Sequence, residues 1–187
     1  MSFRPHVLGV DDGAFEKRTD SSVPVAGVMM EGHDLVEAVA VTEFPVDGAD
    51  AAEFLAQWIS GLRFVSALHG VVLGGVTIAG LGIVDVELLS GRLNLPAMIV
   101  NRRAPANPPL TQALEAAGLA DRIAIVERTP PAWQLEGGLF VAHAGTTREE
   151  ATKILLACRG KSQLPEPLRL AHLIGGAVAV GQSRGRP

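Results

Sequence analysis

The chain has 187 residues, of which 48% are hydrophobic but only 4% aromatic, and it contains no tyrosine. This length favours one domain, residues 1–187, with a core of Val, Leu, Ile and Ala, as in an α/β protein with a mostly buried sheet. The formal net charge of −4 excludes an overall electrostatic attraction to nucleic acid or anionic membrane, although local basic clusters could supply one. A single cysteine, Cys158, excludes an intrachain disulfide, and we expect it to be a small core side chain.

The N-terminus, "MSFRPHVLGV", lacks the long apolar core and the small-residue cleavage site of a signal peptide. The most membrane-like run, residues 70–84, is shorter than the roughly 20 residues needed to span a bilayer. We therefore expect a soluble, cytoplasmic protein with no membrane partner.

The first third of the chain predicts three strands, at about residues 6–11, 24–31 and 34–44, in an antiparallel meander. The polar loop "GAFEKRTDSS" separates the first two strands, and Gly32-His33 turns the chain between the second and the third. Apolar residues then recur at helical spacing, so a helix is predicted to begin at Asp50.

The rest of the chain alternates strands and helices. Apolar runs predict strands at 70–74 and 97–101, with a helix from about Asp85 between them. The remaining expected elements are a helix near 109–117, strands at 123–128 and 138–143, a helix at about 147–159, and a final helix from Pro165 to Gly181. Three antiparallel strands followed by α-β-α-β units describe a mixed sheet with helices on both faces, which is the element order of the ribonuclease H-like architecture.

Two adjacent carboxylates, Asp11 and Asp12, end the first predicted strand in "VLGVDDGAF". Neighbouring side chains on a strand point to opposite faces, so only one of the two is expected to reach a given site. Asp11 continues the strand and is the better ligand candidate, whereas Asp12 precedes a glycine and suits a turn or capping role. Taken alone, the stretch is also compatible with two turn residues.

Three further aspartates lie at predicted helix starts. Asp47 and Asp50 occur in "PVDGADAAEF", and Asp85 follows "GLGI". Their position is typical of turn and N-cap residues. They are also metal-ligand candidates, because Mg²⁺ needs only one or two protein carboxylates together with water and substrate phosphates.

Two other segments are candidates for binding. The stretch "GGVTIAGLG", which contains Thr77, follows a strand and precedes a helix, so we expect a glycine-rich loop there. It lacks the ending of a phosphate-binding loop, so tight turning with close packing is favoured over nucleotide binding. In the last helix Glu166, Arg169, His172 and Gly176 fall on one face, opposite an apolar stripe formed by Leu170, Leu173, Ile174, Ala177 and Val178. The tail that follows contains Ser183, Arg184 and Arg186, of which the arginines are good bidentate donors to phosphate.

The combination of "GVDDGAF", "VDGAD", "GVTIAG…IVD" and "LPEPLRLAHLIGGAVAVGQSRGR" resembles the uncharacterised family called domain of unknown function 99, or UPF0215. The resemblance runs from Val7 to Arg186. That family is considered a relative of endonuclease V, so the resemblance implies a ribonuclease H-like fold.

The resemblance also implies a metal site. Endonuclease V enzymes hold a divalent metal with an aspartate at the end of the first strand, an acidic residue further along, and an aspartate after the next core strand. Asp11 is similar to the first, and Asp47 or Asp50 is the nearest candidate for the second. Gly74 stands at or near the place of the third, and Asp85 could replace that carboxylate from the following helix.

Two functions follow as hypotheses. The first is an endonuclease that depends on Mg²⁺ or Mn²⁺ and acts on DNA or RNA, with Asp11, Asp47, Asp85 and His172 as catalytic candidates. The second is a non-catalytic member of the fold that binds nucleic acid, a nucleotide or a protein through the face of Glu166, Arg169 and His172. The acidic set favours the first, and Gly74 favours the second.

Overall fold

A computed structural model describes residues 3–183, so the predicted binding residues Arg184 and Arg186 lie outside the described residues. Within residues 3–183, no helix combines the length and apolar character that crossing a bilayer requires. Cys158 is fully buried, as expected, and its burial raises the pKa of the thiol to about 12.

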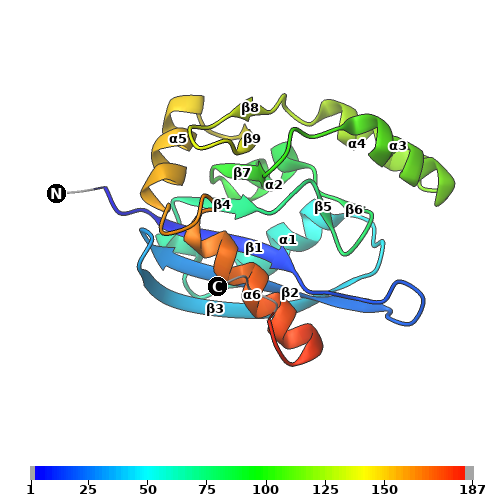
Figure 1. The fold of residues 1–187 in the computed structure, drawn as a ribbon, viewed down its shortest axis with the longest axis horizontal. Helices are drawn as coiled ribbons and strands as arrows, with labels where there is room; N and C mark the ends of the chain where they lie inside the picture. Colours follow the sequence, from blue (N-terminus) through cyan, green and yellow to red (C-terminus); the bar gives the residue numbers. More distant parts are fainter. Residues whose placement is uncertain (1–2, 184–187) are drawn as a thin grey trace.

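A seven-stranded mixed sheet forms the centre of the molecule (Figure 1), in the order β3-β2-β1-β4-β7-β9-β8. Only β1, β4 and β7 run parallel to their neighbours in this group, and the other pairs are antiparallel. The strands are β1 (His6–Asp12), β2 (Ser22–Glu31), β3 (Leu35–Pro45), β4 (Gly70–Leu73), β7 (Ala97–Asn101), β8 (Trp133–Gln134) and β9 (Phe140–Ala144). A separate hairpin consists of β5 (Thr77–Ile78) and β6 (Gly82–Ile83).

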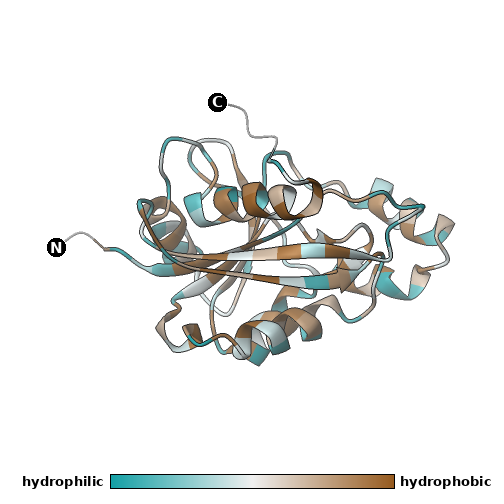
Figure 2. Ribbon diagram, turned by 90° about the horizontal axis from the view of Figure 1, so that it is seen from below, coloured by the Kyte–Doolittle hydropathy of each residue, from teal (hydrophilic) through white to brown (hydrophobic). Residues whose placement is uncertain are grey.

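Helices cover both faces of the sheet, as Figure 2 shows in a nearly edge-on view of the apolar strands. They are α1 (Ala51–Ser60), α2 (Val86–Leu93), α3 (Asn107–Ala116), α4 (Ile123–Arg128), α5 (Arg148–Ala157) and α6 (Glu166–Val180), with short 3-10 turns at Val65–Ala67 and Ala120–Arg122. The α1 and α2 side chains share a core with one face of the sheet, and those of α5 and α6 pack on the other. The predicted α/β, ribonuclease H-like arrangement is thus confirmed at the level of its layers.

Alternation along β1 decides which residues meet which helix layer. Leu8 and Val10 belong to the core on the α1 side, whereas Val7 belongs to the core on the α5 side. Gly9 faces the same side of the sheet as Val7. It lies so close to the first turn of α6 that a Cβ atom there would overlap the carbonyl carbon of Pro167. The absence of a side chain at Gly9 therefore lets α6 lie directly on the strand that carries Asp11.

The buried side of α6 differs from the predicted apolar stripe. Leu168, Ala171 and Gly175 are buried, whereas Val178 from the stripe is 52% exposed. Gly175 is buried because the helix approaches the backbone of Asp12 closely there. Leu170 and Ile174 of the predicted stripe are partly buried against β2. The helix itself was predicted correctly in type and extent.

Two local predictions were wrong. Residues 123–128, expected to be a strand, form helix α4, in which Val126 is buried against a small cluster that includes Leu114. A six-residue apolar run does not distinguish a strand from a short buried helix by periodicity alone. The glycine-rich stretch before Asp85, expected to be a loop, folds into the β5–β6 hairpin, whose turn includes Gly80 at a φ of 92°.

Candidate active site at the ends of the parallel strands

Asp11 and His172 form a hydrogen-bonded pair where β1 meets α6. The Nδ1 atom of His172 lies 2.9 Å from Oδ2 of Asp11, and Oδ1 of Asp11 accepts a hydrogen bond from the backbone N–H of Asp12. The side chain of His172 is 67% exposed and that of Asp11 is 20% exposed. The pair therefore has a fixed geometry while remaining open to solvent.

Three neighbouring parallel strands end at this pair. Asp11 lies near the end of β1, Gly74 directly follows β4, and Arg102 directly follows β7. The carboxyl ends of parallel strands form one edge of a sheet, which is the usual ligand-binding edge of open α/β sheets. This edge therefore brings together one carboxylate, one imidazole and one guanidinium from distant parts of the sequence.

Two hollows meet at Asp11, Gly74 and His172. The first, which we call the α6 cleft, has a volume of about 800 Å³ and is also lined by Asp12, the 13–16 loop, Asp20 and the last turns of α6. The second, which we call the Arg102 pocket, has a volume of about 340 Å³ and is also lined by Asn101, Arg102, Val100, Leu164 and Leu168. A ligand that spans the two hollows would pass over Asp11.

The charges around His172 act in opposite directions on its pKa. The hydrogen bond to Asp11 raises the pKa of His172, and burial and the positive charge of Arg102 oppose this rise. The net direction is upward, which favours an imidazolium that donates from Nδ1 to the carboxylate. Arg102, with His172 beside it, makes this part of the edge attractive to an anion.

Asp12 points to the opposite face of the sheet from Asp11. Its Oδ2 atom accepts a hydrogen bond of 2.6 Å from the backbone N–H of Ala79 in the β5–β6 turn. Burial raises the pKa of Asp12, and the hydrogen bond from Ala79 only partly offsets that rise. Asp12 therefore anchors the hairpin from the last residue of β1, and it is not the local turn or capping residue expected from the sequence.

Asp47 also holds this hairpin. Its Oδ1 atom accepts from the backbone N–H of Leu81 at 2.8 Å, and its Oδ2 atom pairs with Lys17 Nζ at 2.9 Å. Asp47 adopts a left-handed conformation, with a φ of 52°, which is typical of a turn residue. It lines neither hollow at Asp11.

Asp85 is buried as the N-cap of α2. Its Oδ1 atom accepts from the backbone N–H groups of Glu87 and Leu88, each at 3.1 Å, and its Oδ2 atom accepts two bonds from Arg128 at 2.9 and 2.6 Å. Both oxygens are thus engaged, and Asp85 lines neither hollow at Asp11. The structure brings Asp85 together with Arg128 and not with Asp11.

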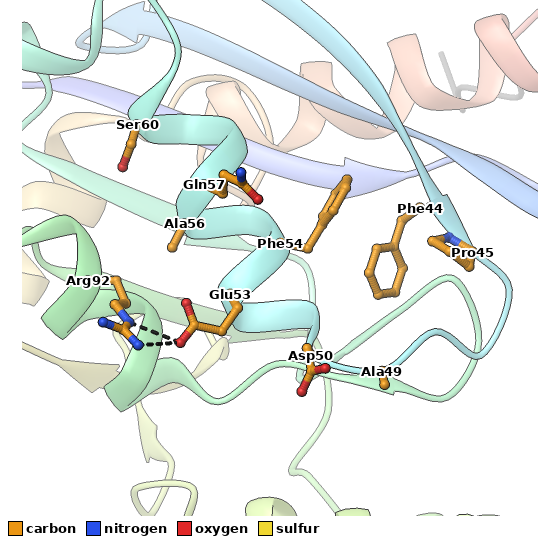
Figure 3. A pocket seen from close by; sticks show the side chains of 10 residues that line it. All are labelled: Phe44, Pro45, Ala49, Asp50, Glu53, Phe54, Ala56, Gln57, Ser60 and Arg92. Atoms are coloured by element: carbon orange, nitrogen blue, oxygen red, sulfur yellow. Dashed lines mark hydrogen bonds and ion pairs between the residues drawn. The ribbon is translucent and has the colours of Figure 1, made fainter.

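Asp50 lines a third hollow, of about 680 Å³, on the α1 side of the sheet (Figure 3). It occupies the N-cap position of α1, as predicted, but its side chain makes no capping hydrogen bond. Glu53 and Arg92, which pair at 2.6 Å, lie beside it in the same hollow. The metal-ligand candidates Asp11, Asp47, Asp50 and Asp85 therefore do not converge.

Two of the other predicted binding residues, Glu166 and Arg169, pair with each other in α6. Arg169 donates from Nε and Nη2 to Oε2 of Glu166, at 2.8 and 2.6 Å, and Glu166 is 6% exposed because the segment before α6 covers it. Oε1 of Glu166 has no partner among the described residues. Ser183 is exposed close to Gly176, which lines the α6 cleft, and Thr77 is exposed at the start of β5.

One group with the composition of a metal site lies at the other end of β1. Among residues 3–183, the group with three suitable ligand atoms within 4.8 Å of one another is His6, Glu31 and Glu37. His6 Nε2 and Glu37 Oε2 are 2.9 Å apart, and Arg4 already donates to Glu31 at 3.0 Å. This group is separate from Asp11, since it lies at the amino end of the same strand.

The sequence interpretation missed Asn101 and Arg102. They end and follow the apolar strand at 97–101, a position that would indicate a ligand-binding edge once β7 was known to run parallel to β4 and β1. Within the described residues, Arg102 makes no ion pair within 4.0 Å. Its charge is therefore not neutralised by a neighbouring carboxylate.

With this geometry established, comparison with known proteins identifies the family. The sequence profile described as Endonuclease dU matches residues 4–179. The chain belongs to the endonuclease dU family. A UPF0215 protein of Methanothermobacter thermautotrophicus is 32% identical over 190 aligned positions, which cover 96% of this chain and 90% of that protein. A UPF0215 protein of Thermococcus gammatolerans is 35% identical, covering 95% and 93%. The predicted UPF0215 membership is confirmed.

Solved structures extend the likeness beyond the endonuclease dU family. A protein of unknown function from Archaeoglobus fulgidus superposes with a TM-score of 0.86 at 29% identity, covering 94% of this chain and 99% of that one. Endonuclease V of Ciona intestinalis, in complex with a 24mer DNA containing an inosine followed by a ribo-adenosine, gives a TM-score of 0.56 at 16% identity, covering 91% and 84%. This second likeness concerns the fold, and it confirms the predicted endonuclease V-like architecture.

Proposed function

We propose that this protein is an endonuclease that cleaves nucleic acid at Asp11, with His172 and Arg102 as the other principal groups of the site. The observation that carries the proposal is the meeting of these three side chains where β1, β4 and β7 end, at the junction of two hollows. The family description, endonuclease dU, and the fold shared with a DNA-bound endonuclease V support nucleic acid as the substrate. Deoxyuridine in DNA is the first substrate to test.

A hard divalent cation, Mg²⁺ or Mn²⁺, is part of this proposal. Asp11 fits such an ion because it lies at an open edge and each of its oxygens accepts only one hydrogen bond, from His172 and from the backbone N–H of Asp12. Each oxygen of Asp85 accepts two bonds, and Asp47 is held at the hairpin. Mg²⁺ keeps several waters and accepts one or two protein carboxylates beside substrate phosphates. When bound, the ion would neutralise charge on the scissile phosphate and supply an activated water.

The protein's own groups would orient the substrate and transfer protons. Arg102, unpaired within the described residues, would hold a phosphate by a bidentate contact in the Arg102 pocket. His172 is held by Asp11 through Nδ1 and lines both hollows, so its second ring nitrogen could donate a proton to the leaving oxygen. The open α6 cleft would admit the nucleic-acid strand on one side of the reacting phosphate.

The test is a cleavage assay on deoxyuridine-containing, inosine-containing, mismatched and single-stranded DNA and RNA, with Mg²⁺ or Mn²⁺. We expect cleavage of at least one substrate by the wild type, and a loss of about 100-fold or more in Asp11→Asn, which keeps the size of the side chain but removes its charge. Asp50→Asn is the matched control, since Asp50 lines a different hollow, and should retain full activity. Equal cleavage by wild type and Asp11→Asn would contradict the proposal.

Gly74 favours a second candidate, a protein that binds nucleic acid without cleaving it. The glycine stands beside Asp11 and offers no side-chain ligand, and Asp47, Asp50 and Asp85 line neither of the hollows at Asp11. This candidate predicts salt-sensitive binding of oligonucleotides with no products under any metal condition. Binding and cleavage measured on the same substrates separate the two candidates.

A further inference from the structure

One face of the edge strand β3 is uncovered. Val28 and Met30 of β2 pack against α6. Their cross-strand partners on β3 are Val39 and Val36, so these side chains point to the α6 side of the sheet, as does Val41 two residues further on. The three β3 valines are 46%, 49% and 45% exposed in chain order, because α6 lies over β1 and β2, the strands that precede β3 in the sheet (Figure 1).

The side of α6 that borders this face is apolar as well. Leu170, Ile174 and Val178 recur at every fourth position and belong to the apolar stripe identified in the sequence. Leu170 and Ile174 are partly buried against β2, whereas Val178 is 52% exposed. We call the combined apolar set the β3–α6 surface, which consists of Val36, Val39, Val41, Leu170, Ile174 and Val178.

The strand β3 lacks the features that usually keep an edge strand apart from other chains. Its eleven residues include no lysine or arginine, and its one proline, Pro45, is the last residue. Four of the eight large apolar side chains that are exposed among residues 3–183 lie on the β3–α6 surface. Long apolar edge strands are normally covered, and exposed apolar patches mark interaction sites.

The charges near the β3–α6 surface are engaged within the chain. Glu37 Oε2 pairs with His6 Nε2 at 2.9 Å, and Glu43 accepts a hydrogen bond of 2.8 Å from Ser22 Oγ. The surface therefore presents apolar side chains beside carboxylates that already have partners, which does not suit a charged partner such as nucleic acid. A nearly neutral apolar surface is complementary to itself, as a two-fold contact between identical subunits requires.

The size of the β3–α6 surface fits a stable contact between subunits. The eleven residues of β3 extend over about 37 Å, and the fifteen residues of α6 over about 22 Å. At a width of about 10 Å for each element, the strip measures about 600 Å² before the relief of its side chains is counted. A standard stable interface buries about 800 Å² of accessible surface on each partner, so the strip approaches the area that a dimer needs.

We infer that the β3–α6 surface binds a second copy of this chain, so that the protein is a two-fold symmetric dimer in which β3 and α6 of each subunit face those of the other. None of the six residues of the surface lines either hollow at Asp11. The dimer therefore leaves the candidate active site open in both subunits and does not depend on the proposed function.

Sedimentation equilibrium of the full chain at micromolar concentrations tests this inference. We expect the wild type to show twice the chain mass of 19.5 kDa, with dissociation on dilution. Val39→Lys on β3 and Val178→Lys on α6 should each raise the dimer dissociation constant at least about tenfold, because two-fold symmetry places two lysines in one apolar contact. Leu88→Lys is the matched control, since Leu88 is an exposed apolar residue of α2, outside the surface, and it should leave the constant unchanged.

Each outcome decides for or against the dimer. A wild type that stays at the mass of one chain throughout this range would overturn the inference, and another kind of partner would then have to cover the surface. A dimer that both lysine variants form as tightly as the wild type uses a different surface and would also overturn it, as would assembly that grows beyond two subunits. Thermal unfolding checks that the variants fold, and the wild-type masses decide the question even if one variant does not.

Discussion

At the scale of single residues, the adjacent carboxylates of Asp11 and Asp12 serve different parts of the molecule. Asp11 meets His172 of α6, and Asp12 holds the backbone of Ala79 on the other face. Strand alternation predicts this division from the sequence alone, since only one of two neighbours can face a site. Alternation does not say which helix lies on which face, so His172 could be proposed as a catalytic residue but not as the partner of Asp11.

The same scale shows why acidic residues near helix starts are ambiguous. Asp85 has the hydrogen bonds of an N-cap, and Asp47 has the conformation of a turn, as their positions predicted. These roles follow from local chain geometry, which a sequence encodes directly. The ion pairs that engage their remaining oxygens come from Lys17 and Arg128, which are distant in sequence and could not be inferred.

His172 gives a pH prediction. Because its pKa is raised by Asp11, the pair stabilises the fold fully below the unfolded pKa of about 6.5, and this contribution is lost as the pH rises through the higher folded pKa. Replacement by Gln, which keeps a donor but does not titrate, should lower the melting temperature most near pH 6 and progressively less as the pH rises. The side chain is 67% exposed, so we expect a difference worth less than about 1 kcal/mol.

Melting temperatures of wild type and His172→Gln, measured between pH 5.5 and 8.5 in EDTA, check this prediction. Lys17→Gln, which breaks an ion pair without a histidine, serves as the control and should give a constant difference over this range. A difference for His172→Gln that does not change with pH would mean that the imidazole does not titrate against Asp11.

At the scale of elements, the first three strands, the helix after Asp50 and the last helix were predictable because their apolar spacing is regular over many residues. The six-residue helix α4 and the two-residue strands of the β5–β6 hairpin were not, since such short segments carry too few residues to reveal a period. Tertiary contacts decide their conformation.

The contact between β1 and α6 gives a stability prediction. In Gly9→Ala, the new methyl group would meet the backbone of Pro167 and Leu168, which cannot move as a flexible side chain could. We expect the free energy of unfolding to fall by about 3 kcal/mol, the upper end of the usual cost of overpacking. Denaturant titration monitored by circular dichroism measures this change.

Gly91→Ala is the matched control for this substitution. Gly91 lies in α2, and no atom lies within 4 Å of the position that its new methyl group would take, so alanine there should stabilise the helix by about 0.5 to 1 kcal/mol. An equal, small effect at both glycines would show that α6 does not press on β1.

At the scale of the whole molecule, the site depends on strand order more than on any motif. Asp11, Gly74 and Arg102 are separated by many residues and meet because β4 lies between β1 and β7 and all three run in one direction. A single sequence predicts that these strands exist but not which of them are neighbours. For this reason the carboxylates could be named in advance, whereas their lack of convergence and the place of Arg102 could not.

The overall charge of −4 repels nucleic acid, so binding would depend on a few local cations. If Arg102 contacts one phosphate, Arg102→Ala should reduce the salt dependence of single-stranded oligonucleotide binding, lowering the slope of log K against log salt by about 0.7. Fluorescence anisotropy at several salt concentrations measures this slope. Arg63→Ala removes an exposed cation that lines neither of the hollows at Asp11 and should leave the slope unchanged.

Successive side chains of β1 face opposite sides of the sheet, and this alternation limits how the strand can change in length. Inserting or deleting one residue between Gly9 and Asp11 would exchange the faces of the two aspartates, so that Asp12 met α6 and Asp11 met the hairpin. A strand of this kind can exchange many of its side chains for others of similar size, yet it cannot change in length by a single residue without losing its site. We therefore expect β1 of related proteins to differ by substitutions alone, with insertions and deletions confined to the loops at either end of the strand.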